Sequence, residues 1–219
     1  LDRLSEADLV GQDYARQERG LESEERRVDL VRLRLDLRVE KKRALRAVVA
    51  AGVIDDALAF CVENKLNTIV SGGTSTGKTT LTNALLAEIS KTADRVVLIE
   101  DTRELQCAAP NLVAMRTKDG VASLSDLVRS SLRLRPDRIP IGEVRGAEAL
   151  DLLKAWGTGH PGGVGTIHAG TAIGALRRME QLIQEAVVTV PRALIAETID
   201  LVAVLSGRGA SRRLAELAR

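Results

Sequence analysis

The segment 72–79 constrains the fold more than any other part of the chain. Its residues, GGTSTGKT, fit the pattern G-x-x-x-x-G-K-[ST] of a phosphate-binding loop. A short β-branched, apolar run at 68–71 precedes the loop, and residues 80–89 follow it with leucine and isoleucine at helical spacing. Because the pattern binds phosphate when it lies between a strand and a helix, the sequence predicts a strand, a phosphate-binding loop (P-loop) and a helix in that order.

The residue types of this loop explain how it would bind a nucleotide. Glycines let successive backbone N–H groups point at phosphate oxygens, and the following helix directs its positive end to the same place. We expect Lys78 to reach the β- and γ-phosphates of ATP, and Thr79 to bind Mg²⁺ through its hydroxyl. The predicted nucleotide-binding residues are Gly72, Gly73, Thr74, Ser75, Thr76, Gly77, Lys78, Thr79 and Thr80.

Composition narrows the class of protein. The chain has 219 residues, of which 45% are hydrophobic and 28% charged, as in an ordinary soluble globular protein. The net charge of +2 argues neither for nor against a nucleic-acid partner, because it builds no strong basic field. Aromatic residues are scarce (Tyr14, Phe60 and Trp156), which speaks against a stacking platform for single-stranded nucleic acid, and sequence-specific nucleic-acid binding is not expected. No apolar run approaches the roughly 20 residues of a membrane span. Charged residues interrupt the start of the chain, so it does not resemble a signal peptide. We therefore expect a cytoplasmic protein. Cys61 and Cys107 are predicted to be free thiols, buried or partly buried.

The hydrophobic pattern predicts an α/β fold. Residues 1–66 form a charged N-terminal segment with a predicted strand at 31–39 and helices at 41–51 and 55–65. From residue 67 to 219 strands and helices alternate, which indicates one domain with a mostly parallel sheet and helices on both faces. The predicted strands are 68–71, 95–100, 112–116, 138–143, 163–168 and a last one at 199–205; the predicted helices are 80–89, 124–134, 147–156 and 172–186.

Polar residues follow several of these strands. Ligands of open α/β sheets bind beyond the carboxyl ends of the strands, so we expect Glu100, Glu143 and His168 to lie at one edge. Glu143 fits a general base or water-orienting residue, His168 a γ-phosphate sensor, and Asp101 a ligand of Mg²⁺. Arg145 could contact phosphate or pair with a neighbouring acid.

Structural alternatives stay open at this point. The acids after residue 99 could be a solvated strand exit or a helix cap, Glu143 could sit on a surface turn, and His168 could be structural. His160 more simply fixes a glycine turn, and Pro140 is unfavourable in a central strand because it lacks a donor. Two histidines without a cysteine or carboxylate at ligand spacing make a zinc site an unfavoured interpretation.

Taken together, four stretches resemble the ATPases of the type II and type IV secretion superfamily, with the conjugative-transfer ATPases as the most similar branch. The stretches are the P-loop at 72–79, the acidic box IEDTREL at 99–105, the Walker B stretch RPDRIPIGEVRGAE at 135–148 and the histidine box GHPGGVGTIHA at 159–169. The resemblance covers about residues 66–219. It implies a RecA-like core, a ring-shaped homohexamer, and ATP hydrolysis that drives pilus assembly or substrate transfer together with inner-membrane components, at the cytoplasmic face of that membrane. It also implies catalytic roles for Glu100, Glu143 and His168.

Three features depart from the family pattern. Relatives usually have a longer N-terminal domain that supplies arginines, and here about 66 residues precede the core. Ser75 lies in the stretch where relatives often have a further glycine, and a positive φ there costs about 1 kcal/mol. Pro140 is the third. Arg103 and Arg116 are candidates for the arginine that meets the γ-phosphate. The alternatives to a motor are a nucleotide-gated assembly module with little turnover and a RecA-like DNA motor.

Overall fold

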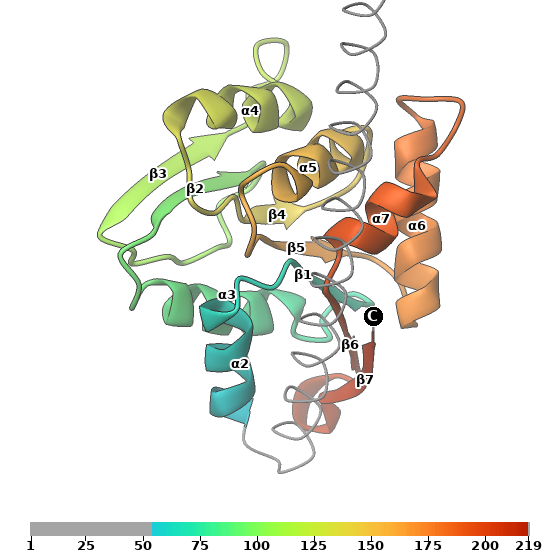
Figure 1. Ribbon diagram of the computed structural model, residues 1–219. Coiled ribbons are helices and arrows are strands. Elements are labelled where there is room, and N and C mark those ends of the chain that lie inside the picture. The colour runs from blue at the N-terminus through green and yellow to red at the C-terminus, as the bar shows by residue number, and fades with distance from the viewer. Residues whose placement is uncertain (1–53, 219) are drawn as a thin grey trace, which may run out of the picture. The chain divides into compact units, whose positions relative to one another are not determined.

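A single seven-stranded sheet organises the part of the chain that the computed structural model describes, residues 54–218 (Figure 1). The strand order is β3-β2-β4-β5-β1-β6-β7. Six strands run parallel, and β7 pairs antiparallel with β6 at one edge. The strands are β1 (Thr68–Gly72), β2 (Arg95–Glu100), β3 (Asn111–Arg116), β4 (Ile141–Glu143), β5 (Val164–Ile167), β6 (Leu201–Ser206) and β7 (Arg213–Ala218).

Helices cover both faces of the sheet, as the pattern predicts. On one face lie α2 (Ile54–Glu63) and α3 (Lys78–Ile89); α3 packs on β1 and β5. The other face carries α4 (Leu124–Ser131), α5 (Glu148–Gly157), α6 (Ala172–Gln184) and α7 (Arg192–Thr198). Figure 1 shows α4 and α5 on the side of the sheet opposite α2 and α3. The mostly parallel α/β fold is therefore confirmed.

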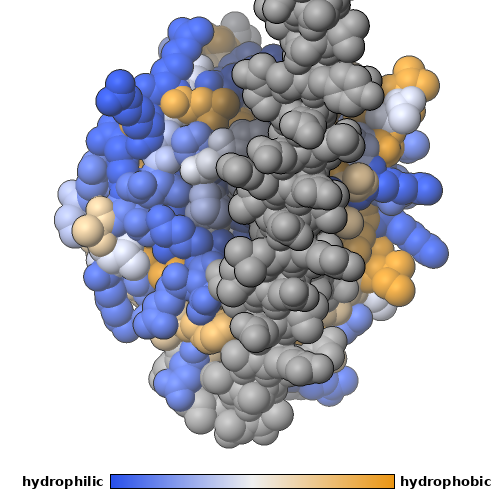
Figure 2. Space-filling view, in the orientation of Figure 1, coloured by the Kyte–Doolittle hydropathy of each residue, from blue (hydrophilic) through white to orange (hydrophobic). Residues whose placement is uncertain are grey.

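The core lies between the sheet and these helices. Strands covered on both faces read as continuous apolar runs, and β2 illustrates this, since Val96, Val97 and Ile99 are completely buried. Trp156 on α5 is buried and donates its indole N–H to the carbonyl of Ile139 at 2.9 Å. The visible face of the molecule is mainly hydrophilic, with hydrophobic residues showing beside α6 (Figure 2).

Local sequence signals explain several element boundaries. Ser123 begins α4 with a capping box, in which its hydroxyl accepts from Asp126 N and the Asp126 carboxylate accepts from Ser123 N. Thr171 caps α6 by accepting from Gly174 N. The helix predicted at 124–134 consists of α4 and a 3₁₀ turn at Leu132–Leu134. Arg135 ends this turn in a left-handed conformation with φ 51°, and Pro136 follows it.

Two predictions about strands are wrong. The strand predicted at 138–143 is regular only from Ile141, because Pro140 has no N–H to continue the ladder. Before that point β2 still bonds to this segment, through Val97 N to Arg138 O and Ile99 N to Pro140 O, both at 3.0 Å. The strand at Leu201–Ser206 is not the last one, because β7 follows it; α7 was not predicted either.

The structure leaves several predictions about the N-terminal part of the chain open. The predicted strand at 31–39 and helix at 41–51 lie outside the described residues, and the domain boundary between residues 66 and 67 stays a prediction.

Cys61 is buried and Cys107 half-buried, and both are free thiols, as predicted. Within 54–218, no helix has the length and apolar character that a membrane crossing needs.

Candidate nucleotide site

The P-loop joins β1 to α3 in the predicted strand–loop–helix arrangement. Gly72 has φ 153°, and a Cβ there would lie 2.7 Å from the carbonyl oxygen of Leu205 on the neighbouring strand. Gly77 has φ 99° and immediately precedes α3. Ser75 lies between them in a left-handed conformation with φ 64°, so the loop does require a positive φ where this chain has serine.

Lys78 lies over the mouth of the loop. Its Nζ donates to the carbonyl oxygens of Gly72 and Gly73, each at 3.0 Å, and lies 3.4 Å from Nε2 of His168. Partial burial lowers the pKa of Lys78, while the charges of Glu143 and Glu104 act in the opposite direction. A lysine held this way is positioned to exchange carbonyl partners for phosphate oxygens.

The Walker B stretch forms a charged cluster with the histidine box. Oε1 of Glu143 lies 2.8 Å from Nε2 of His168, and Oε2 lies 2.7 Å from both Nε and Nη2 of Arg145. Arg145 also donates through Nη1 to Oδ2 of Asp101 at 2.8 Å. The hydrogen bond to Glu143, together with the charges of Glu143 and Asp101, raises the pKa of Arg145 although burial lowers it. Arg145 therefore pairs with acids rather than standing free.

One cavity of about 300 Å³ collects most of the predicted site residues, and these come from four strand ends. Its lining contains Thr74, Ser75, Lys78, Thr79, Asp101, Glu143, Arg145 and His168 from the predicted set, with Thr102, Glu104, Leu105, Gly142 and Thr166 beside them. The carboxyl ends of β1, β2, β4 and β5 thus meet at one edge, as expected for a parallel sheet.

Glu100 is not among the residues that line this cavity. It is 3% exposed, and its Oε2 accepts hydrogen bonds from the backbone N–H groups of Glu104 and Leu105, both at 3.1 Å. The carboxylate therefore shapes the loop that follows β2. A catalytic role for Glu100 stays a prediction, and this geometry points to an indirect one.

Three residues near the P-loop were not predicted. Glu104 accepts a hydrogen bond from the Thr79 hydroxyl at 3.3 Å, Thr166 lines the cavity, and Arg212 donates to the carbonyl of Ser75 at 3.2 Å. Glu104 could have been predicted from the sequence, because it lies in the acidic box at 99–105. Nothing in the local pattern around Arg212 relates it to a loop 137 residues earlier.

Two predicted arginines lie elsewhere. Arg103 and Arg116 line a second hollow of about 850 Å³, formed by residues of α3, the loop after β2 and strand β3. Neither is among the residues that line the P-loop cavity. Their candidacy for the arginine that meets the γ-phosphate of a neighbouring copy stays a prediction.

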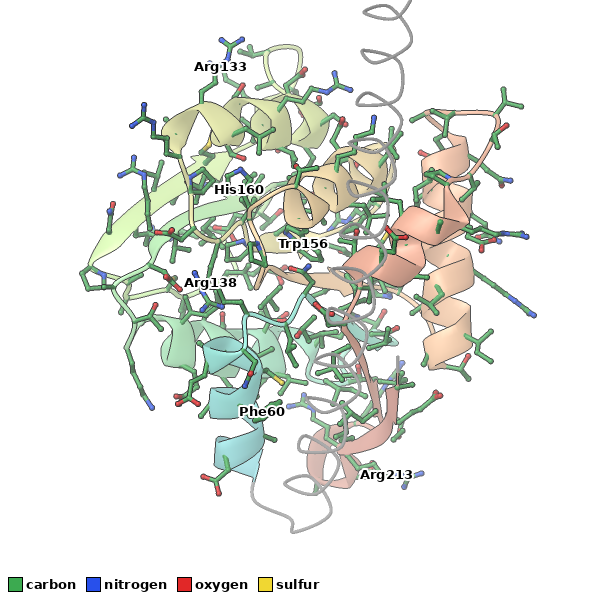
Figure 3. The ribbon with its side chains drawn as sticks, viewed as in Figure 1. Phe60, Arg133, Arg138, Trp156, His160 and Arg213 are labelled. Atoms are coloured by element: carbon green, nitrogen blue, oxygen red, sulfur yellow. The ribbon has the colours of Figure 1, made fainter. Side chains whose placement is uncertain are left out.

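The first half of the histidine box is structural. Nδ1 of His160 lies 2.6 Å from the carbonyl of Pro136, and Asn67 Oδ1 accepts from the N–H groups of Gly162 and Gly163. Arg138, 2% exposed, donates to the carbonyl of Gly162 at 3.3 Å. His160, Arg138 and Trp156 lie in one part of the molecule (Figure 3). These contacts fix the glycine turn that leads into β5 and His168.

The donor set fits Mg²⁺. The cavity presents the hydroxyl of Thr79 and the carboxylates of Asp101 and Glu104, all hard oxygen ligands. Among residues 54–218 no group of three or more histidine, cysteine or acidic side chains forms a ready-made metal site. Mg²⁺ is commonly held by one or two carboxylates together with substrate phosphates, and the oxygens of Thr79, Asp101 and Glu104 are of the kind it takes.

Most of the chain matches proteins that are already known. The family model described as "Type II/IV secretion system protein" matches residues 33–208. The conjugal transfer protein TrbB of Rhizobium radiobacter is 50% identical over 163 residues, which are 74% of this chain and 50% of that protein. The chain spans about half the length of the curated relatives it matches.

Two of the solved structures that match this chain illustrate the shared fold. The VirB11 ATPase of the Brucella suis type IV secretion system, in complex with sulphate, superimposes with a TM-score of 0.73 at 30% identity, over 81% of this chain and 55% of that one. The pilus retraction motor PilT with bound ADP gives a TM-score of 0.60 at 26% identity, over 74% and 50%.

Proposed function

The chain belongs to the type II/IV secretion system protein family, and from that membership we propose that it is a Mg²⁺-dependent ATPase that powers conjugative transfer or type IV secretion. The observation that carries the proposal is the single cavity in which Lys78, Thr79, Glu143 and His168 meet. In this proposal the P-loop amides and Lys78 bind the β- and γ-phosphates, and the Thr79 hydroxyl, now bonded to Glu104, turns to the metal. Bound Mg²⁺ would neutralise charge on the phosphate oxygens.

Glu143 is the proposed water-orienting residue. It is half-buried, and His168 lies between its carboxylate and Lys78 Nζ. A γ-phosphate seated at Lys78 would therefore come next to His168, with Glu143 behind it to orient the attacking water. Arg145 holds Glu143 in this direction, and transition-state charge would be met by Lys78 and the loop amides.

A second candidate is a nucleotide-gated assembly module with little turnover. It is favoured by one observation, namely that both oxygens of Glu143 are engaged, one by His168 and one by Arg145. A carboxylate held on both sides must exchange a partner before it accepts a proton from water. No contact described above favours the remaining alternative, a RecA-like DNA motor.

The assembly and location are proposed on the resemblance to secretion ATPases. We expect a homohexameric ring, partners among inner-membrane secretion or conjugation components, and a peripheral position at the cytoplasmic face of that membrane. Native mass measurement with and without Mg²⁺-ATP tests the ring, because a monomer under both conditions contradicts it.

Phosphate release per subunit separates the motor from the assembly module. The full chain is mixed with ATP and Mg²⁺, and the Lys78→Ala variant serves as the blank. Sustained release above the blank supports the ATPase. Binding of Mg²⁺-ATP by calorimetry without release supports the assembly module, and no binding at all contradicts both.

A further inference from the structure

The turn between β6 and β7 is held in one conformation by its own contacts. Gly207 has φ 79°, and a Cβ there would lie 2.1 Å from the carbonyl oxygen of Ser211. Arg208 N donates to Oγ of Ser211 at 3.1 Å, and this hydroxyl donates back to the Arg208 carbonyl at 2.8 Å. Only glycine fits such a close approach with a positive φ, so the turn presents the residue that follows it in a defined place.

That place is the P-loop. Strand β6 lies beside β1 in parallel, with Leu205 opposite Gly72, so the turn after β6 and the P-loop leave the sheet at the same edge. Arg212 reaches across, and its Nε donates to the Ser75 carbonyl at 3.2 Å. Its Cδ would lie 3.5 Å from a Cβ on Gly77. The arginine side chain therefore runs along the loop from residue 77 to residue 75.

Ser75 is the point at which the loop needs support. Its φ of 64° is a conformation that side chains other than glycine resist. A loop that turns its N–H groups toward an anion turns carbonyl groups the other way, where a donor from a neighbouring segment can hold them. Arg212 supplies that donor at the one strained residue of the loop.

We propose that Arg212 is a positioning residue of the nucleotide site, which holds the Ser75 carbonyl and so keeps the P-loop in its phosphate-binding shape. The inference rests on the proposed function, because the shape of the loop matters only if the loop binds a nucleotide. Arg212 also lies beyond residue 208, where the match to the family ends.

The expected effect is on affinity rather than on the chemical step. When a site is competent for only a fraction of the time, its apparent dissociation constant rises by the inverse of that fraction. Without Arg212, the strained serine lets the loop leave its binding shape. With glycine at position 75 the strain is gone, and Arg212 becomes dispensable.

Calorimetric titration of Mg²⁺-ADP into the full chain tests this, with the wild type and the variants Arg212→Ala, Ser75→Gly and the double variant. We expect Arg212→Ala to weaken binding about five- to tenfold, and the same change in the Ser75→Gly background to weaken it less than about twofold. Arg213→Ala is the matched control. Arg213 is the next residue, is also exposed, and begins β7 (Figure 3); this variant should bind as the wild type does.

Each other result has a defined meaning. If Arg212→Ala binds like the wild type while Lys78→Ala does not bind, the inference is overturned and the proposed function stands. Equal losses with and without Ser75→Gly also overturn it, because Arg212 would then act by a route other than the strained serine. If the wild type gives no heat with Mg²⁺-ADP, the proposed function itself fails. Equal thermal unfolding midpoints for all variants exclude a loss of fold as the cause.

Discussion

Arg145 and Glu143, two residues apart in the chain, meet at the edge of the sheet, where Nε and Nη2 of the arginine both lie 2.7 Å from Oε2 of the glutamate. The same guanidinium bonds to Asp101, which follows β2. One cation therefore orients two acids from different strands. Because the other oxygen of Glu143 contacts His168, the carboxylate has a single orientation relative to the P-loop.

Removal of the Arg145 charge is expected to lower turnover. The variant Arg145→Gln leaves Glu143 and Asp101 without their shared cation, so we expect kcat to fall at least about tenfold, with KM changed less than threefold. Steady-state phosphate release measures both. Arg129→Gln is the matched control, since Arg129 is also an exposed arginine in an ion pair, with Asp151 on α5. A rise in kcat would mean that Arg145 restrains Glu143 rather than positions it.

Glu143 itself is expected to separate binding from hydrolysis. The variant Glu143→Gln keeps the size of the side chain and loses its capacity to accept a proton, so Mg²⁺-ATP should bind within about threefold of the wild type while hydrolysis falls at least a hundredfold. Calorimetry and phosphate release report the two quantities. Normal turnover would remove Glu143 from the mechanism.

Asp94 is expected to stabilise the fold above about pH 4. Arg138, 2% exposed, donates to Asp94 at 2.5 Å. Although partial burial raises the pKa of Asp94, the hydrogen bond and charge of Arg138, with help from Lys65, lower it overall. A carboxyl whose folded pKa is depressed stabilises the native state above its unfolded pKa, and this stabilisation is lost as pH falls through the folded pKa.

The variant Asp94→Asn should therefore lower the free energy of unfolding by about 2 to 3 kcal/mol at pH 7, since it leaves a buried guanidinium without its charged partner. The difference from the wild type should shrink as the pH falls below about 4. Urea unfolding at several pH values measures this. Asp151→Asn is the control, because its partner Arg129 is 66% exposed and such pairs contribute less than about 1 kcal/mol. A difference that does not depend on pH would contradict the ion-pair explanation.

Gly163 is expected to tolerate no side chain. A Cβ there would lie 2.1 Å from ring atoms of Trp156, which is itself buried and bonded to Ile139. We expect Gly163→Ala to lower the free energy of unfolding by about 3 kcal/mol through overpacking. Gly170→Ala has nothing within 4 Å of the added atom and should change it by less than about 0.5 kcal/mol. Similar unfolding free energies for the two variants would contradict this account of the core.

Much of the fold follows from local patterns. The run at 95–100 is a strand over the predicted residues, and the P-loop lies between β1 and α3. Strand β7 was missed because its sequence, RLAELA, has neither a clear alternation nor an apolar run. This agrees with its burial, since three of its six residues are exposed and the others half-buried. Its pairing with β6 defines it, and that is not a local property.

The phosphate-binding loop, the alternation of strands and helices, and the acids and histidine at the strand ends were all predictable, because each depends on residues close together in the chain. The partners that those side chains share were not predictable in this way. Glu100 turned inward to the loop after its strand, Glu143 came between Arg145 and His168, and Arg212 met Ser75. These contacts join residues from different strand ends. Their geometry is set by the order of the strands and by packing, and neither can be inferred from the spacing of residues along the chain.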